Sequence, residues 1–95
     1  MTKRFSVRYT KKASKALDKM DAFDSKLILS WINKNLKDCD DPRVFGKSLS
    51  GDRSGEWRYR VGDYRIIAEI IADEVLILVV AIGHRRDVYK TKNGV

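Results

Sequence analysis

The second half of the chain contains three strand-like segments that are only two residues apart, and this spacing restricts the folds that the chain can adopt. The segments cover residues 56–61, 64–72 and 75–82, and the connections between them are Gly62-Asp63 and Asp73-Glu74. A two-residue connection joins antiparallel neighbours, because a parallel pair needs a crossover of a dozen or more residues. The spacing therefore predicts a three-stranded antiparallel meander. Its last strand is apolar on both faces, which suits the interior of a sheet.

The first half of the chain predicts one more strand and two helices. Apolar and polar residues alternate from Phe5 to Tyr9, as in a strand with one buried face. Apolar residues then recur every three or four positions over 11–20 and 27–36, which is typical of amphipathic helices, with caps expected at Thr10 and within 21–24. The segment Cys39-Asp40-Asp41-Pro42 is expected to break the second helix, because proline cannot continue the hydrogen-bond ladder. The expected class is α+β, in the order strand, helical hairpin, meander.

Length, charge and cysteine content narrow the function. The 95 residues fit a single domain, 1–95, and the 20 Lys and Arg against 13 Asp and Glu give a net charge of +7, which indicates a polyanionic partner. Cys39 and His84 are the only residues of their kinds, so we expect no disulfide, no metal site and no cofactor. The sequence has neither a signal-peptide pattern nor an apolar run of about 18 residues, which favours a cytoplasmic protein without a membrane partner.

The hairpin around Gly62-Asp63 brings arginines together. If these two residues form the turn, the numbers of cross-strand partners sum to 125, so Arg60 faces Arg65. Side chains alternate along a strand, which places Arg58 on the same face as Arg60. Like charges opposite one another destabilise a sheet, so this convergence indicates an anion site. A single arginine, in contrast, would suit an ordinary solvated face.

A second polar cluster follows the last predicted strand, at residues 83–89 (Gly-His-Arg-Arg-Asp-Val-Tyr). Side chains that leave the end of a buried strand are held by a rigid scaffold, which suits a functional site. Taken singly, His84 also fits a surface histidine and Tyr89 a packing residue. Three other charged residues fit ordinary surface charge: Arg4, Arg8 and Glu69.

Together these segments resemble the RelE/ParE toxin superfamily of bacterial and archaeal toxin–antitoxin systems, and especially its RelE branch of ribosome-dependent endoribonucleases. The resemblance runs from the first helix through Leu49-Ser50-Gly51 to residues 83–89, and the pair Tyr64-Arg65 and the closing cluster are its most diagnostic parts. It implies a small four-stranded sheet with both helices packed on one face. The active site is then expected on the concave opposite face.

The resemblance also implies a chemistry. RelE-like toxins cut messenger RNA in the ribosomal A site, where the ribose 2′-hydroxyl attacks the adjacent phosphorus and leaves a 2′,3′-cyclic phosphate and a 5′-hydroxyl. This reaction needs a base, cations for the developing charge, and an acid, but no metal. The implied catalytic residues are Arg58, Arg60, Arg65, His84, Arg85 and Tyr89. The expected RNA-binding residues are Lys47, Arg53 and Arg86.

Arg58 and Arg60 depart from relatives that carry lysine at these positions. An arginine essentially never releases its proton, so both are expected to clamp phosphate rather than to act as bases. His84 is a candidate acid or base, although it stands where other members have a basic residue. Glu56, on the same strand face as Arg58, is a second candidate base. Tyr89 is expected either to stack on a nucleobase or to take part in proton transfer.

Partners and alternatives follow from the same resemblance. It implies a RelB-like or similar antitoxin, the ribosome with its A-site mRNA, and operator DNA for the toxin–antitoxin complex. Two other functions stay open: a ParE-like toxin that inhibits DNA gyrase without nuclease activity, and a non-catalytic RNA-binding module, for which charge alone is sufficient. The convergence of cations favours the nuclease, because gyrase binding gives no reason to gather them around one phosphate.

Overall fold

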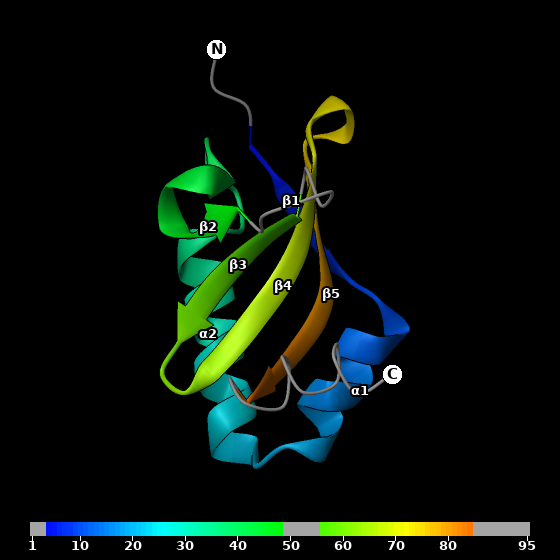
Figure 1. The fold of residues 1–95 in the computed structure, drawn as a ribbon, viewed down its shortest axis with the longest axis vertical. Helices are drawn as coiled ribbons and strands as arrows, with labels where there is room; N and C mark the ends of the chain where they lie inside the picture. Colours follow the sequence, from blue (N-terminus) through cyan, green and yellow to red (C-terminus); the bar gives the residue numbers. More distant parts are fainter. Residues whose placement is uncertain (1–3, 49–55, 85–95) are drawn as a thin grey trace.

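A computed structural model describes residues 4–48 and 56–84, and in this part of the chain two helices pack against one face of a five-stranded sheet (Figure 1). The elements are β1 (Ser6–Tyr9), α1 (Lys11–Lys19), α2 (Ala22–Asn35), β2 (Lys47–Ser48), β3 (Glu56–Val61), β4 (Tyr64–Ile71) and β5 (Leu76–His84), with short 3-10 turns η1 (Pro42–Phe45) and η2 (Ala72–Glu74). This confirms the predicted α+β class. Neither helix is long and apolar enough to cross a membrane.

The strands lie in the order β1-β5-β4-β3-β2, with β1 parallel to β5 and all other pairs antiparallel. The meander β3-β4-β5 is confirmed, but the prediction of four strands is wrong, because the short β2 adds a fifth at the edge. Gly46 makes this addition possible. A Cβ at Gly46 would lie 2.5 Å from the Arg58 carbonyl oxygen and 2.7 Å from the Tyr59 ring, so only glycine lets the chain approach β3 this closely.

Both predicted helix caps are present. The Thr10 side chain accepts a hydrogen bond from the backbone N–H of Ala13, and the Asp21 carboxylate accepts one from the N–H of Phe23. The Thr10 hydroxyl also donates to the carbonyl oxygen of Val80, at 3.1 Å. This second bond ties the start of α1 to β5, the strand on which α1 packs.

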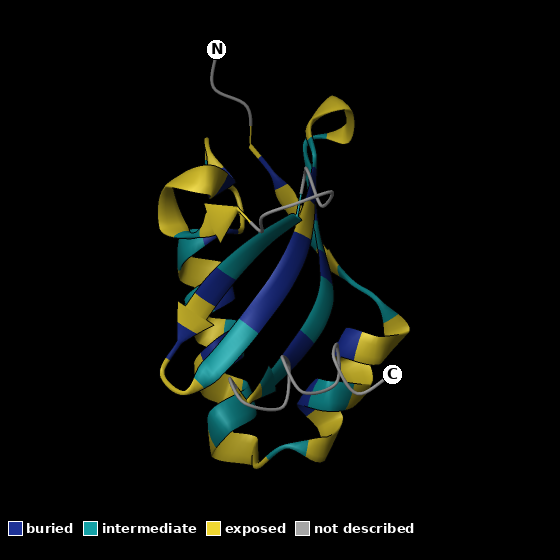
Figure 2. Cartoon of the chain, viewed as in Figure 1, coloured by how far each residue is buried: buried dark blue, intermediate teal, exposed yellow. Residues whose placement is uncertain are grey.

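The core lies between the helices and one face of the sheet, and Figure 2 shows its buried residues as dark bands along the central strands. Apolar residues of α1 and α2 meet alternate residues of the strands, because alternate side chains point to the same face. Tyr59 is the largest fully buried side chain, and its hydroxyl donates to the Pro42 carbonyl oxygen at 2.9 Å. Burial raises the pKa of this phenol.

The structure confirms the first of the two predicted turns but not the second. Gly62 has φ +59° at the first turn position, a conformation that favours glycine, and the register Arg60 with Arg65 is as predicted. The second connection is not a two-residue hairpin: Asp73 and Glu74 belong to η2, and Val75 follows with φ +50°. The register between β4 and β5 also shifts, so that Val80 has no partner in β4 and forms a bulge.

Candidate functional site

The face of the sheet opposite the helices gathers cations at one end of β3 and β4. Arg60 lies directly opposite Arg65, and Lys47 of β2 lies directly opposite Arg58. Directly opposed residues share a face and have Cβ atoms about 4.5–5.5 Å apart. We call this face the open face and these four residues, Lys47, Arg58, Arg60 and Arg65, the basic cluster. The structure thus brings together four residues that were predicted from the sequence.

The helix-facing side of the same strands explains why the cluster points outward. Tyr59, Val61 and Ile66 alternate with the arginines and are buried in the core. With those side chains fixed in the core, the pleat leaves the intervening residues no orientation but the open face. A one-residue slip in register would bury the arginines, so the core determines the position of the site.

Arg65 differs from the other cations in its surroundings. Its Nε is buried and, within residues 4–48 and 56–84, is the only such side-chain nitrogen or oxygen without a hydrogen-bond partner. A buried donor without an acceptor costs about 1–3 kcal/mol. The Nε–H of Arg65 is thus enclosed by the protein, and the four N–H bonds on the two terminal nitrogens of the guanidinium are the donors suited to an external acceptor such as a phosphate oxygen.

Two carboxylates lie next to the basic cluster. Glu56 is directly opposite Glu69, on the open face and two residues from Arg58 along β3. Two residues span about 6.8 Å in an antiparallel strand, so the carboxylates and the guanidinium groups are neighbours. From the sequence we interpreted Glu69 as surface charge. The register sum of 125 also pairs Glu69 with Glu56, and this signal would have identified it.

The ring of His84 lies on the helix-facing side, away from the basic cluster. His84 pairs with Tyr64, and the two rings meet edge to face with centroids 5.8 Å apart. The Tyr64 hydroxyl donates to the Asp24 carboxylate at 2.7 Å, and this hydrogen bond raises the pKa of Tyr64. Gly83, the neighbour of His84, is instead opposite Arg65 on the open face. The structure does not bring His84 together with the arginines.

The other predicted site residues, Arg53, Arg85, Arg86 and Tyr89, lie outside the described residues, as does the segment Leu49-Ser50-Gly51. Their roles stay predictions. Among residues 4–48 and 56–84, no group of three or more histidine, cysteine or acidic side chains could hold a metal ion. The described site thus consists of cations and carboxylates on one sheet face.

Comparisons with known proteins identify the family of this chain. Residues 7–89 match the family model of the ParE toxin of type II toxin–antitoxin systems. A protein of Escherichia coli described as RelE-like toxin is 31% identical over 90 residues, which cover 90% of each chain.

Solved structures of RelE proteins have the same fold. The RelBE2 toxin–antitoxin complex of Mycobacterium tuberculosis contains a chain that superposes with a TM-score of 0.78 at 24% identity, covering 90% of this chain and 94% of that one. A free E. coli RelE variant gives a TM-score of 0.72 at 18% identity, covering 92% of each chain. An archaeal RelE–RelB complex from Pyrococcus horikoshii gives 0.64 at 21% identity, covering 86% and 96%.

Proposed function

Because this chain belongs to the RelE/ParE superfamily of toxins from type II toxin–antitoxin systems, we propose that it is a ribosome-dependent endoribonuclease that cuts messenger RNA in the A site. The observation that carries the proposal is the basic cluster on the open face, in which Arg60 lies directly opposite Arg65 and Lys47 directly opposite Arg58. A gyrase inhibitor or a generic RNA-binding surface gives no reason to converge cations at one point.

The proposed reaction begins with the scissile phosphate at Arg65. Arg65 and Arg60 lie opposite each other, so their planar groups can contact two non-bridging oxygens of one phosphate. As the 2′-hydroxyl attacks, negative charge develops on those oxygens. Fixed cations stabilise this charge more than they stabilise the ground state, which accelerates the step. Arg58 and Lys47 extend the positive surface along the RNA backbone.

We assign the general base of this reaction to Glu56. It lies on the open face two residues from Arg58 and four residues, about 14 Å of strand, from Arg60. A ribose held between Glu56 and the Arg60–Arg65 pair would place its 2′-hydroxyl where this carboxylate can take the proton. The proton removed from the 2′-oxygen goes to this carboxylate. The departing 5′-oxygen needs a proton from a separate acid, and Tyr89 of the closing motif is the candidate that the family resemblance implies.

The partner of a type II toxin is an antitoxin, and solved relatives are complexes with RelB. We propose that a RelB-like antitoxin covers the basic surface with an acidic segment that also carries apolar residues. The described part of the chain also exposes four large apolar side chains on α2 and η1 rather than on the open face, where a further part of the antitoxin can anchor: Phe23, Leu27, Val44 and Phe45. Binding of the toxin–antitoxin complex to operator DNA is part of the same proposal.

The ParE-like alternative is favoured by one observation, the family model that matches residues 7–89. One experiment separates the two functions. The purified protein is incubated with translating ribosomes and, in parallel, with DNA gyrase and plasmid. The nuclease proposal expects new mRNA 5′ ends in the A site and a 2′,3′-cyclic phosphate on the upstream fragment. Gyrase-dependent DNA breaks with intact mRNA would establish the ParE-like function instead.

A further inference from the structure

Helix α1 carries a concentration of charge that the proposed active site does not use. Its nine residues include four lysines and a single aspartate, a net charge of +3. All four lysines are exposed, and we call Lys11, Lys12, Lys15 and Lys19 the lysine ridge. At 100° per residue they occupy one side of the helix, whereas Ala13 and Leu17 face the core on the other side.

The lysine ridge is unfavourable for the isolated helix. Lys11 and Lys15, and again Lys15 and Lys19, are like charges four residues apart, and each such pair destabilises a helix by about 0.2–0.5 kcal/mol. Lys11 and Lys12 also lie in the first turn, at the positive end of the helix dipole, where no acidic residue accompanies them. In residues 4–48 and 56–84, none of the four lysines has an ion-pair partner. Folding stability therefore does not explain the lysine ridge.

We propose that the lysine ridge binds the phosphate backbone of double-stranded RNA, and that it docks the protein on ribosomal RNA. The inference rests on the proposed ribosomal function. Lysines four residues apart are separated by about 6 Å along the helix axis, so Lys11, Lys15 and Lys19 can follow successive phosphates of one strand. Each contact releases a counterion, which supplies affinity without reading sequence.

The composition around the lysine ridge selects RNA over other polyanions. Protein interfaces are built around apolar anchors and are depleted in lysine, and the large apolar side chains exposed in the described part of the chain lie on α2 and η1, not on α1. Operator DNA needs side chains that read base edges, typically arginine, asparagine or glutamine. Helix α1 has none of these residues. A contact to backbone alone is suited to a ribosomal RNA helix.

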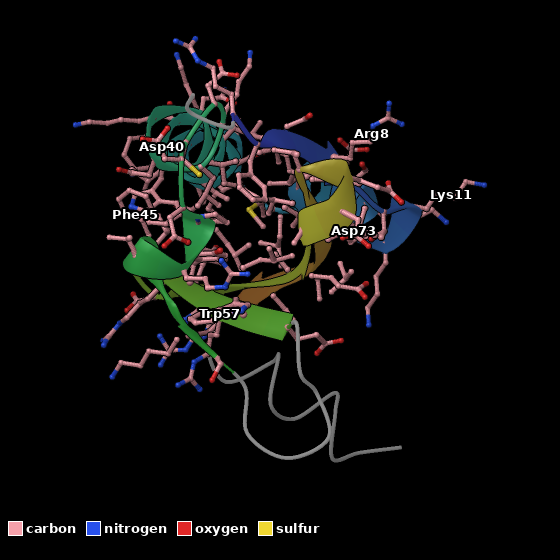
Figure 3. The ribbon with its side chains drawn as sticks, turned by 90° about the horizontal axis from the view of Figure 1, so that it is seen from above. Arg8, Lys11, Asp40, Phe45, Trp57 and Asp73 are labelled. Atoms are coloured by element: carbon pink, nitrogen blue, oxygen red, sulfur yellow. The ribbon has the colours of Figure 1, made fainter. Side chains whose placement is uncertain are left out.

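The lysine ridge is separate from the basic cluster. Helix α1 follows β1, the edge strand three positions from β3, which places β1 and β3 about 14 Å apart at ~4.8 Å per strand. Arg8 of β1 and Lys11 project outward on the same side of the molecule, as Figure 3 shows. The two basic regions can therefore engage different RNA segments at once, one for docking and one for cleavage.

The test compares two triple variants with the same change in net charge. Lys11→Gln/Lys15→Gln/Lys19→Gln removes three ridge charges, and Lys26→Gln/Lys34→Gln/Lys37→Gln removes three exposed lysines of α2 and its C-terminal end. Binding to a 16-base-pair RNA duplex is measured at several salt concentrations. The same measurement is made with a DNA duplex of the same sequence and with a polyglutamate peptide.

The ridge variant is expected to bind the RNA duplex at least tenfold more weakly than wild type at physiological salt, and its log–log salt slope should fall by about 2–3. The α2 variant should stay within about threefold of wild type. Equal losses of duplex affinity in both variants would overturn the proposal that the lysine ridge is the docking surface. Tenfold tighter binding of wild type to DNA or to polyglutamate would overturn the assignment to RNA.

A cleavage assay on ribosomes distinguishes a failure of docking through the lysine ridge from a failure of the proposed nuclease function. On ribosomes, the ridge variant should require a higher ribosome concentration for half-maximal cleavage but keep the maximal rate, because the basic cluster is unchanged. If the wild type never cuts mRNA but the ridge variant loses duplex binding, the nuclease proposal is refuted and the docking role of the lysine ridge is supported. If the wild type cuts mRNA and the ridge variant binds the duplex as tightly as the wild type does, only the docking role of the lysine ridge is refuted.

Discussion

At the residue scale, the orientation of each polar side chain follows from the pairing of β3, β4 and β5. Arg65 is opposite Arg60 and Gly83, whereas the next residue along β5, His84, is opposite Tyr64 and turns to the other side of the sheet. Adjacent residues in a strand cannot reach the same face. Among the described residues of these strands, the carboxylates on the same face as Arg65 are Glu56 and Glu69.

The assignment of the base is testable with isosteric variants. Glu56→Gln should lower the rate of A-site cleavage about 10²–10⁴-fold, because general base catalysis contributes roughly that factor. His84→Gln should keep the rate within about threefold, since its ring packs on Tyr64. Single-turnover cleavage of ribosome-bound mRNA measures both. A full rate for Glu56→Gln, or a larger loss for Glu69→Gln, contradicts the assignment to Glu56.

The buried hydroxyl of Tyr59 should contribute to the free energy of unfolding. Its hydroxyl satisfies the Pro42 carbonyl inside the core, so Tyr59→Phe should lower the free energy of unfolding by about 1–3 kcal/mol at neutral pH. Burial raises the pKa of Tyr59, which means that the native state keeps the proton at a pH where the unfolded chain has lost it.

Above pH ~10 this difference in proton binding should destabilise the wild type by up to about 1.4 kcal/mol per pH unit. Phenylalanine has no proton to lose, so Tyr59→Phe should lose less stability over the same range. Urea unfolding from pH 7 to 11 measures both proteins. Parallel pH profiles would show that Tyr59 does not stay protonated in the native state.

The sequence predicted the cation pairing because it depends on one turn, Gly62-Asp63, and on strict alternation. It did not predict the orientation of His84, because the last strand is apolar on both faces and its pattern does not show which side faces the helices. A bulge at Val80 also changes the phase of β5 relative to β4. One residue added in a bulge reverses the faces of all residues beyond it.

At the scale of elements, Thr10 is the junction among β1, α1 and β5. Its backbone N–H donates to the Val79 carbonyl, and its hydroxyl bonds to both Ala13 and the bulged Val80. The bulge leaves Val80 without a β4 partner, and the Thr10 hydroxyl gives its carbonyl a hydrogen-bond donor. The cap of α1 thus also fixes the irregular part of the sheet.

Replacing this hydroxyl tests the junction. Thr10→Val keeps the shape but removes both side-chain hydrogen bonds, so the free energy of unfolding should fall by about 1–3 kcal/mol. Ser14→Ala is the control, because Ser14 is exposed on the same helix and its hydroxyl has no partner in the described part of the chain. That control should stay within about 0.5 kcal/mol of wild type. Equal effects of the two substitutions in urea unfolding would argue against the junction.

The order of elements was accessible from sequence patterns, but the edges of the sheet were not. Strand β2 has only two residues, which is too short for a period-2 pattern, and it pairs with β3 because Gly46 permits a close approach. The parallel pairing of β1 with β5 joins the ends of the described chain. Such a contact between distant segments has no local signal in the sequence.

At the scale of the whole molecule, the net charge of +7 is divided between regions with different proposed roles. The basic cluster binds the reacting phosphate in the proposal, and the lysine ridge provides the docking contact. The exposed apolar side chains of α2 and η1 offer a third kind of surface, suited to a protein partner. Ribosome binding and antitoxin binding should therefore respond differently to salt.

The salt dependence of the two complexes tests this division. Ribosome affinity should fall steeply with added salt, because phosphate contacts release counterions. Affinity for the antitoxin should fall less steeply, since apolar anchors contribute in addition to complementary charge. Dissociation constants are measured for both complexes between low and physiological salt. Equal slopes on log axes would contradict the role of apolar anchoring.

Binding of the scissile phosphate to the open face through Arg65 is best tested by measuring cleavage by an Arg65→Ala variant. Purified wild type and variant are added to translating ribosomes, and mRNA 5′ ends are mapped over time, with circular dichroism to verify that the variant is folded. Wild type should cut mRNA in the A site, and the variant should lose at least 10²-fold in cleavage rate, because one preorganised donor to a developing oxyanion is worth about 10²–10³ in rate. A folded variant that cuts at the wild-type rate would show that Arg65 does not bind the scissile phosphate.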